Sequence, residues 1–186
     1  LCSEPSAKLL PLVLEDAFRL ELSREPKHIE LFIQRLKQQV IALPFDHWFS
    51  IEQTDTLHAR IRLQRAGHIL GSAYVECDLD YPGSDLNRRV VFSGDLGAPH
   101  TPLLPAPVSP RRADMLILES TYGDRVHEDR TTRQARLESV IDKALADHGT
   151  LLIPAFSIGR TQELIYEIED ILHRKALAST PAGVSK

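Results

Sequence analysis

The sequence has few cysteines, few aromatic residues and no long apolar segment among its 186 residues. Its two cysteines, Cys2 and Cys77, are too few and too far apart for a disulfide framework or a zinc knuckle, so we expect a reducing, cytoplasmic environment. No apolar run approaches the roughly 20 residues that span a bilayer, and no segment resembles a secretory signal. We therefore expect neither a membrane-spanning helix nor a membrane partner.

The sequence also lacks a basic excess. It has 22 Lys and Arg against 26 Asp and Glu, a net charge of −4. Proteins that hold nucleic acid by bulk electrostatics usually carry a clear positive charge. Any polyanionic ligand must therefore be bound at a local site.

The rest of the composition is that of an ordinary globular protein, with 42% apolar and 26% charged residues. At roughly 150 residues per domain, the length allows one domain or one domain with part of another. The chain begins at Leu1 and its only methionine is Met115, so we expect it to be a piece of a longer protein.

Two helices are predicted at the start of the chain. Apolar residues recur every three to four positions from about Pro5 to Leu20 and again from Lys27 to Leu43. Pro11 lies inside the first pattern and predicts a kink or a late start, and Pro44 is expected to end the second helix.

The apolar period then changes to two, which predicts half-buried and mostly antiparallel strands at about 57–64, 73–80 and 88–92. A turn at 81–85 joins the last two as a hairpin. In the second strand the apolar face is formed by Ala73, Val75, Cys77 and Leu79, and the polar face by Tyr74, Glu76, Asp78 and Asp80.

The second half of the chain has the pattern of an α/β domain. Five prolines between Pro99 and Pro110 indicate a loop and a candidate domain boundary. Beyond it, an apolar strand at 115–118, a helix near 137–145, an apolar strand at 150–153 and a helix near 164–172 favour parallel strand pairing. The tail from Ala176 to Lys186 is small and polar, which is typical of a linker or a frayed end.

Three polar residues stand just beyond apolar strands: His68, Asp95 and Glu119. An imidazole and a carboxylate are suitable zinc ligands, and a pair of metal ions can activate water and clamp the oxygens of a phosphodiester. Each residue alone has a simpler interpretation. His68 could be a hydrogen-bonded structural histidine, Asp95 a turn residue, and Glu119 a helix-entry or salt-bridge carboxylate.

Together the motifs resemble the beta-CASP branch of the metallo-beta-lactamase fold, and most closely its RNA-processing members. The four segments that carry the resemblance are Ala66-Gly67-His68-Ile69-Leu70-Gly71-Ser72-Ala73, Phe92-Ser93-Gly94-Asp95-Leu96-Gly97, Leu118-Glu119-Ser120-Thr121-Tyr122-Gly123-Asp124-Arg125 and Ile153-Pro154-Ala155-Phe156-Ser157-Ile158-Gly159-Arg160-Thr161-Gln162-Glu163-Leu164.

The resemblance implies a role for each residue of the site. His68 matches the third metallo-beta-lactamase motif, a ligand to one zinc, and Asp95 matches the fourth, the carboxylate that bridges two zincs. Glu119 matches the first beta-CASP motif, which hydrogen-bonds a histidine supplied later in the chain; that histidine would protonate the departing oxygen.

Substrate contacts are expected around these motifs. The loop from Ser157 through Gly159 to Arg160 opens a helix, so its amides and the guanidinium would hold an RNA phosphate. The other predicted substrate-binding residues are Ser120, Tyr122 and His127.

The departures from the family pattern also matter. The run His-x-His-x-Asp-His is absent, as are the later beta-CASP histidines, so only two metal ligands are visible. We expect a partial metallo-beta-lactamase αββα sandwich at 1–122, the start of an α/β beta-CASP domain at 123–175 and a linker or frayed tail at 176–186. We also expect that this fragment binds zinc poorly and is inactive alone.

The predicted function is that of a part of a zinc-dependent hydrolase of single-stranded RNA, in which a hydroxide activated by two zinc ions attacks the phosphodiester. Two alternatives remain, a non-catalytic RNA-processing scaffold subunit and a small-molecule hydrolase such as a lactonase or thioesterase. The last would need neither the Glu119 motif nor the Arg160 loop. Endonuclease and exonuclease action both stay open, and a homodimer is expected only through surfaces that truncation exposes.

Overall fold

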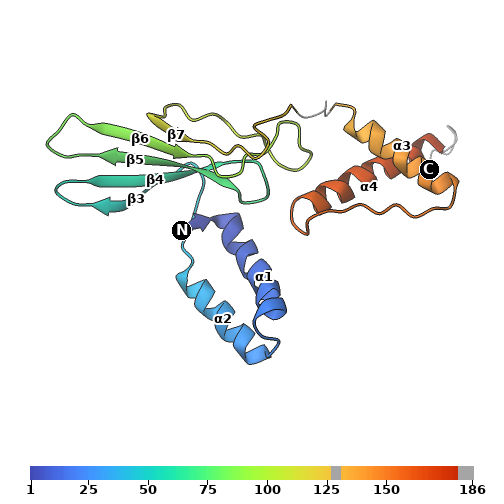
Figure 1. Ribbon diagram of the computed structural model, residues 1–186, viewed down its shortest axis with the longest axis horizontal. Coiled ribbons are helices and arrows are strands. Elements are labelled where there is room, and N and C mark those ends of the chain that lie inside the picture. The colour runs from blue at the N-terminus through green and yellow to red at the C-terminus, as the bar shows by residue number, and fades with distance from the viewer. Residues whose placement is uncertain (127–130, 180–186) are drawn as a thin grey trace, which may run out of the picture. The chain divides into compact units, whose positions relative to one another are not determined.

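The computed structural model describes residues 1–126 and 131–179, and the chain divides into two units (Figure 1). The first unit comprises Leu1–Pro99 and Leu104–Glu119. The second comprises His100–Leu103 and the chain from Ser120 onward. None of the described helices is long and apolar enough to cross a membrane.

Two helices open the first unit, α1 (Glu4–Glu21) and α2 (Pro26–Gln39). The Ser3 hydroxyl caps α1 by accepting a hydrogen bond from the backbone N–H of Ser6. The helix continues through Pro11, so the predicted late start is wrong. The rings of Phe18 and Phe32 stack with their centroids 4.6 Å apart, which joins the two helices through their apolar faces.

The second helix ends earlier than predicted, at Gln39 instead of Leu43. Val40 is already extended, and Ala42–Leu43 forms the short strand β2, which pairs in parallel with β1 (Cys2–Ser3). The paired strand is favoured over a longer helix because it also buries Leu43.

The main sheet of the first unit has five strands in the order β3-β4-β5-β6-β7 (Figure 1). Strands β3 to β6 are antiparallel neighbours, and β7 pairs in parallel with β6. The mixed α/β class and the three-stranded antiparallel core are therefore confirmed, whereas β3 was not predicted. The bounds are β3 (Trp48–Gln53), β4 (His58–Arg65), β5 (Ala73–Asp80), β6 (Asn87–Phe92) and β7 (Met115–Ile117).

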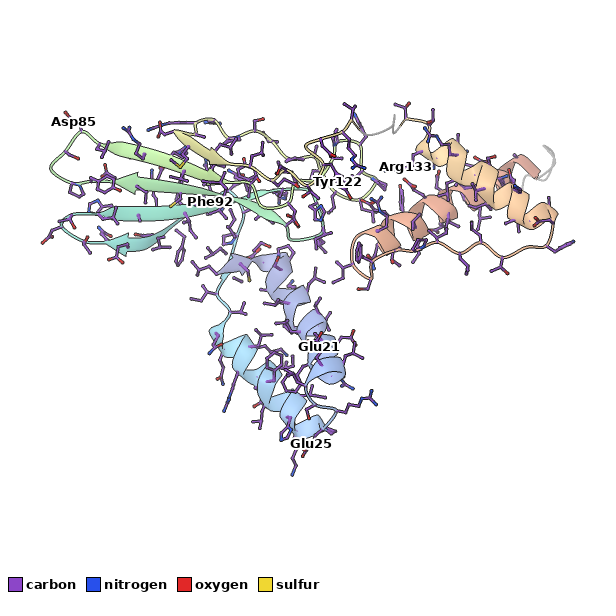
Figure 2. All side chains as sticks on the ribbon, viewed as in Figure 1. Glu21, Glu25, Asp85, Phe92, Tyr122 and Arg133 are labelled. Atoms are coloured by element: carbon purple, nitrogen blue, oxygen red, sulfur yellow. The ribbon has the colours of Figure 1, made fainter. Side chains whose placement is uncertain are left out.

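The apolar face of this sheet is only half covered. Register places Ile61 opposite Cys77, Cys77 opposite Val90, and Val75 opposite Phe92. Phe92, labelled in Figure 2, is 45% exposed, and Val75 and Cys77 are half-buried. A partial sandwich leaves such a face, because the complete layered fold packs it against a second sheet.

The polar face is the buried one, which inverts the burial predicted for β5. Tyr74, Glu76 and Asp78 are 5%, 0% and 4% exposed. The proline-rich loop covers part of this face, and the Tyr74 hydroxyl donates to the carbonyl of Val108 at 2.8 Å. Burial is tolerated because arginines on neighbouring strands pair with the two carboxylates.

These ion pairs surround one tryptophan. Arg89 donates twice to the Asp78 carboxylate, at 2.6 and 2.9 Å, and Arg60 donates once, at 3.0 Å. Arg62 binds Glu76 at 2.5 Å. The three guanidinium groups lie 4.6 to 5.0 Å from the ring of Trp48, so cation–π attraction adds to the pairing.

The second unit contains a pair of helices, α3 (Arg133–Ala146) and α4 (Arg160–Ser179). They are joined by polar contacts between Arg133 and Glu167, between Gln134 and Asp170 at 2.6 Å, and by others nearer their far ends. Both helices were predicted. Because α4 extends to Ser179, the predicted linker is wrong at 176–179, and the remainder of that tail lies outside the described residues.

The apolar run at 150–153 is not a strand, contrary to the prediction. Its side chains are exposed, Leu152 by 84%, and no described strand of this unit offers it a backbone partner. An apolar run without a neighbouring strand has no ladder to join.

Candidate active site

Three strands of the main sheet end in the loops that carry the predicted site. His68 follows β4, Asp95 follows β6 and Glu119 follows β7. All three residues belong to the first unit. A rigid sheet thus presents one imidazole and two carboxylates on short connections.

The loops of His68 and Asp95 are held together by their backbones. Gly67, the residue before His68, forms an antiparallel bridge with Leu96, the residue after Asp95. The N–H of Gly97 donates to the carbonyl of Ala66 at 2.7 Å. A side chain at Gly97 would put its Cβ 1.9 Å from the Gly67 oxygen, so only glycine permits this approach. The structure therefore brings these two predicted residues onto adjacent backbone.

The side chains of His68 and Asp95 are exposed, and neither has a hydrogen bond or ion pair within residues 1–126 and 131–179. A structural histidine would be hydrogen-bonded, and a turn aspartate would bond its own backbone. Neither simpler interpretation fits. The two groups are free to accept a ligand.

Glu119 has a different environment. It is half-buried, and its Oε1 accepts the backbone N–H of Leu96 at 2.5 Å, a charge-assisted bond. Its own N–H donates to the Ser93 hydroxyl at 2.9 Å. The next described helix begins only at Arg133, so Glu119 is not a helix-entry residue. Its carboxylate secures the loop that carries Asp95.

Ser93 completes this connection, although its sequence pattern did not single it out. Ser93 is 4% exposed, and its hydroxyl donates to the Gly94 carbonyl at 2.7 Å. Its N–H donates to the carbonyl of Ile117 at 2.9 Å. The available signal in the sequence was a serine between an apolar strand and a glycine. The Asp95 and Glu119 loops are thus tied by side-chain and backbone hydrogen bonds in both directions.

The predicted substrate residues lie in the second unit. Ser120 and Tyr122 belong to a run of turns in which their carbonyls accept N–H groups from Gly123 and Arg125. Tyr122, labelled in Figure 2, is 58% exposed. His127 lies outside the described residues.

The predicted phosphate loop does open a helix, since a turn at 157–159 leads into α4. Two of its donor groups are engaged internally, however. The N–H of Gly159 donates to Gln162 Oε1 at 2.7 Å, and Gln162 Nε2 donates to the carbonyl of Ser157 at 2.9 Å. Arg160 pairs with Glu163 at 3.2 Å. An anion that takes the Gly159 N–H must displace the Gln162 side chain, and at Arg160 it competes with Glu163.

Zinc suits the chemistry of the strand-end donors but needs more of them. His68 and Asp95 supply one imidazole and one carboxylate, and a stable site has at least three protein ligands. Within the described part of the chain, no group of three or more His, Cys, Asp or Glu residues is arranged to hold a metal. Two cavities of about 480 Å³ lie on the polar face of the sheet, and neither is lined by His68, Asp95 or Glu119.

A mixed sheet presents a histidine and two carboxylates in the loops after β4, β6 and β7, which is the arrangement that the resemblance to the metallo-beta-lactamase fold implies. No family model matches the chain. It is 31% identical to ribonuclease TTHA0252 of Thermus thermophilus over 168 residues, which is 89% of this chain and 36% of the relative. It is 33% identical over 120 residues to cleavage and polyadenylation specificity factor 73 of Drosophila melanogaster, covering 64% of this chain and 17% of the relative.

An RNase J-like protein of Methanocaldococcus jannaschii is 28% identical over 184 residues, 97% of this chain and 40% of the relative. The first and third of these relatives match 89% and 97% of this chain, and both carry ribonuclease-type names. The chain therefore belongs to the beta-CASP family of the metallo-beta-lactamase fold. It spans 17% to 40% of the length of these relatives.

Proposed function

We propose that the chain is part of a zinc-dependent hydrolase that cleaves phosphodiester bonds of single-stranded RNA. The observation that carries the proposal is the bridge between Gly67 and Leu96, which sets two zinc-type ligands, both without a side-chain partner among the described residues, on adjacent backbone. The names of the RNA-processing relatives support the choice of substrate.

Each residue of the chain has a distinct task in this proposal. His68 and Asp95 would both hold metal, with the remaining ligands supplied by other segments. When bound, the metal pair supplies the activation of water and neutralises charge on the phosphate. Glu119 keeps the Asp95 loop in place through the N–H of Leu96, which fixes the Asp95 carboxylate. Its family role toward a later histidine is compatible with this bond, since a carboxylate accepts several donors.

The phosphate loop is a conditional part of the site. Arg160 and the Gly159 N–H are suitable donors for a phosphate oxygen, but their present partners are Glu163 and Gln162. We propose that RNA binding exchanges these partners for phosphate. Local donors of this kind allow an acidic chain to take a polyanion.

The test is cleavage of a single-stranded RNA by the full-length protein that carries this chain, with and without zinc. Asp95→Ala should lower zinc-dependent cleavage by about 100-fold or more, because the metal pair contributes several kcal/mol to transition-state stabilisation. Asp85→Ala is the matched control, since Asp85 lies at the exposed turn between β5 and β6 (Figure 2). Undiminished cleavage by Asp95→Ala would reject the proposal.

The same assay separates the alternatives. RNA binding without cleavage in the wild-type protein would favour a scaffold subunit. Hydrolysis of a lactone or thioester, with RNA left intact, would favour a small-molecule hydrolase. Nothing in the structure or the comparisons supports the expected homodimer, and we do not propose one.

A further inference from the structure

The N-terminus of α1 contacts the loop that carries His68, across 68 residues of sequence. The Ser3 hydroxyl donates to the carbonyl of Gly71 at 2.6 Å. The Ser6 hydroxyl lies 3.1 Å from the same oxygen and 3.0 Å from the Ser3 hydroxyl. Two serines on the first turn of a helix thus hold one carbonyl of the candidate metal loop.

Ser3 is built into this position. It is 2% exposed, and its oxygen also accepts the Ser6 N–H at 3.3 Å as the helix cap. The single hydroxyl therefore accepts from the helix and donates to the loop. A buried hydroxyl with both functions satisfied fixes the helix end and the loop relative to each other.

The loop side of the contact is equally close. Gly71 has φ +94°, and a Cβ there would lie 2.5 Å from the Ser6 hydroxyl oxygen and 2.7 Å from the Ser6 nitrogen. A side chain would force the helix and the loop apart. The close approach thus requires glycine on one partner and small hydroxyl residues on the other.

The loop between these anchors is closed on itself. The N–H of Ala66 donates to the Ser72 carbonyl at 3.0 Å, and the N–H of Ser72 donates to the Ile69 carbonyl at 3.0 Å. The N–H of Ile69 donates to the Ser72 hydroxyl at 3.2 Å. A displacement of Gly71 must therefore be transmitted to His68, which lies inside the same ring of hydrogen bonds.

We infer that Ser3 is a positioning residue for His68. It holds the far side of the 66–72 loop against α1, while the bridge from Gly67 to Leu96 holds the near side. The value of this arrangement for metal binding rests on the proposed function, in which His68 is a ligand. The restraint on the loop does not depend on it.

Two measurements on the 186-residue chain test the inference. The first is the amide hydrogen exchange of Ile69 and Ser72, whose N–H groups are hydrogen-bonded within the loop. The second is an NMR titration with cobalt(II) alone, which reports weak binding at His68 through paramagnetic broadening. Ser3→Ala should speed exchange at both amides and weaken cobalt binding, each by about tenfold, the size typical of groups that orient a ligand.

Ser3→Thr keeps both a donor and a helix cap, so it should restore both readouts toward wild type. Ser84→Ala is the matched control, because that hydroxyl donates to a backbone carbonyl at 2.9 Å in a distant turn. Equal acceleration of exchange throughout α1 and the sheet, without rescue by Ser3→Thr, would mean general destabilisation and would overturn the inference. Unchanged exchange at Ile69 and Ser72 would overturn it too.

The His68→Ala variant separates this inference from the proposed function. If cobalt broadening is unchanged in His68→Ala, the ligand role of His68 in this chain is rejected, whereas the proposed function is judged separately by the cleavage assay of Asp95→Ala. The exchange rates of Ile69 and Ser72 then decide alone whether Ser3 restrains the loop. If His68→Ala abolishes the broadening while Ser3→Ala leaves it unchanged, the ligand role stands and the positioning role is rejected.

Discussion

The ionisable side chains of the first unit form two regions of opposite character on the same sheet. On the polar face of the sheet, Glu76 and Asp78 are buried and bound by arginines. At the strand ends, His68 and Asp95 are exposed and have no partner in the described segments. Buried, paired charges shape and stabilise the sheet, whereas exposed, unpaired ones at a fixed position are available to a ligand.

The two regions also differ in what holds them together. The strand-end loops have the tightest backbone contacts of the site, whereas the polar face relies on long, ion-paired side chains. Precise loops with free side chains are what a metal site needs, because ligand geometry must be set before the ion arrives. The two regions therefore predict different responses to substitution.

The largest effect is expected at Gly97. Gly97→Ala would place its Cβ within 2 Å of the Gly67 carbonyl, so the two loops must separate and lose their bridge. We expect a loss of about 3 kcal/mol or more in the free energy of unfolding, at the upper end of overpacking costs. Urea denaturation followed by circular dichroism measures it.

Gly83→Ala is the control for this variant. Gly83 has φ +83°, but a Cβ added there would meet no atom within 4 Å, so this substitution isolates the backbone cost of about 1 kcal/mol. Equal losses of unfolding free energy in Gly97→Ala and Gly83→Ala would show that the close contact between Gly97 and Gly67 does not matter for stability.

A loss of about 3 kcal/mol is expected for Asp78→Asn at pH 7, because it leaves Arg89 with a weakened partner in a buried cluster. Burial alone raises the pKa of Asp78, but the hydrogen bonds from Arg89 and Arg60 outweigh it and hold the pKa below its ordinary value. The stabilisation is therefore present above about pH 4 and is lost as the pH falls through the lowered folded pKa.

Thermal unfolding between pH 2 and pH 7 checks this sign. The difference between wild type and Asp78→Asn should shrink toward the acid end of the range. Asp80→Asn, two residues along β5 and largely exposed, should change little at any pH. A difference that grows toward low pH would contradict the assignment of Asp78 as an ion-paired carboxylate.

Glu119 combines features of both regions. It belongs to the candidate site, and its carboxylate also stabilises the Asp95 loop. Glu119→Ala removes the acceptor of the Leu96 N–H and should cost about 2 kcal/mol, the range for hydrogen bonds to charged groups. Glu119→Gln keeps an acceptor and should cost about half as much. The amide shift of Leu96 reports the bond directly, and an unchanged shift in Glu119→Ala would remove the proposed restraint on the Asp95 loop.

The sequence predicted elements well where periodicity was unbroken, and it failed where pairing decided the outcome. Strands β4 and β5 alternate cleanly and were predicted, and β6 was predicted as the hairpin partner of β5. Strand β3 was missed because it begins with two adjacent apolar residues, Trp48 and Phe49, and ends with two polar ones, so the period of two covers only its middle. The segment at 150–153 was overpredicted, because an apolar run does not reveal whether a neighbouring strand exists.

The candidate residues of the site could be named from the sequence, whereas the contacts that support them could not. His68, Asp95 and Glu119 came from motifs that lie next to each residue. The contacts of Ser93 with Glu119 and of Ser3 with Gly71 join residues 26 and 68 apart, which only the folded backbone brings together. The burial of Glu76 and Asp78 was likewise hidden, because cross-strand register alone pairs them with arginines.

The smallest effect on stability is expected at the two proposed ligands themselves. His68→Ala and Asp95→Ala should change the free energy of unfolding by about 0.5 kcal/mol or less, as is usual for exposed side chains without partners. Urea denaturation of this chain without added metal measures both, with Asp85→Ala beside them. A loss as large as that of Asp78→Asn would mean that these side chains hold the fold together, and the distinction between stabilising and ligand-binding charges would fail. A neutral result, combined with loss of cobalt binding, would separate function from stability at these two positions.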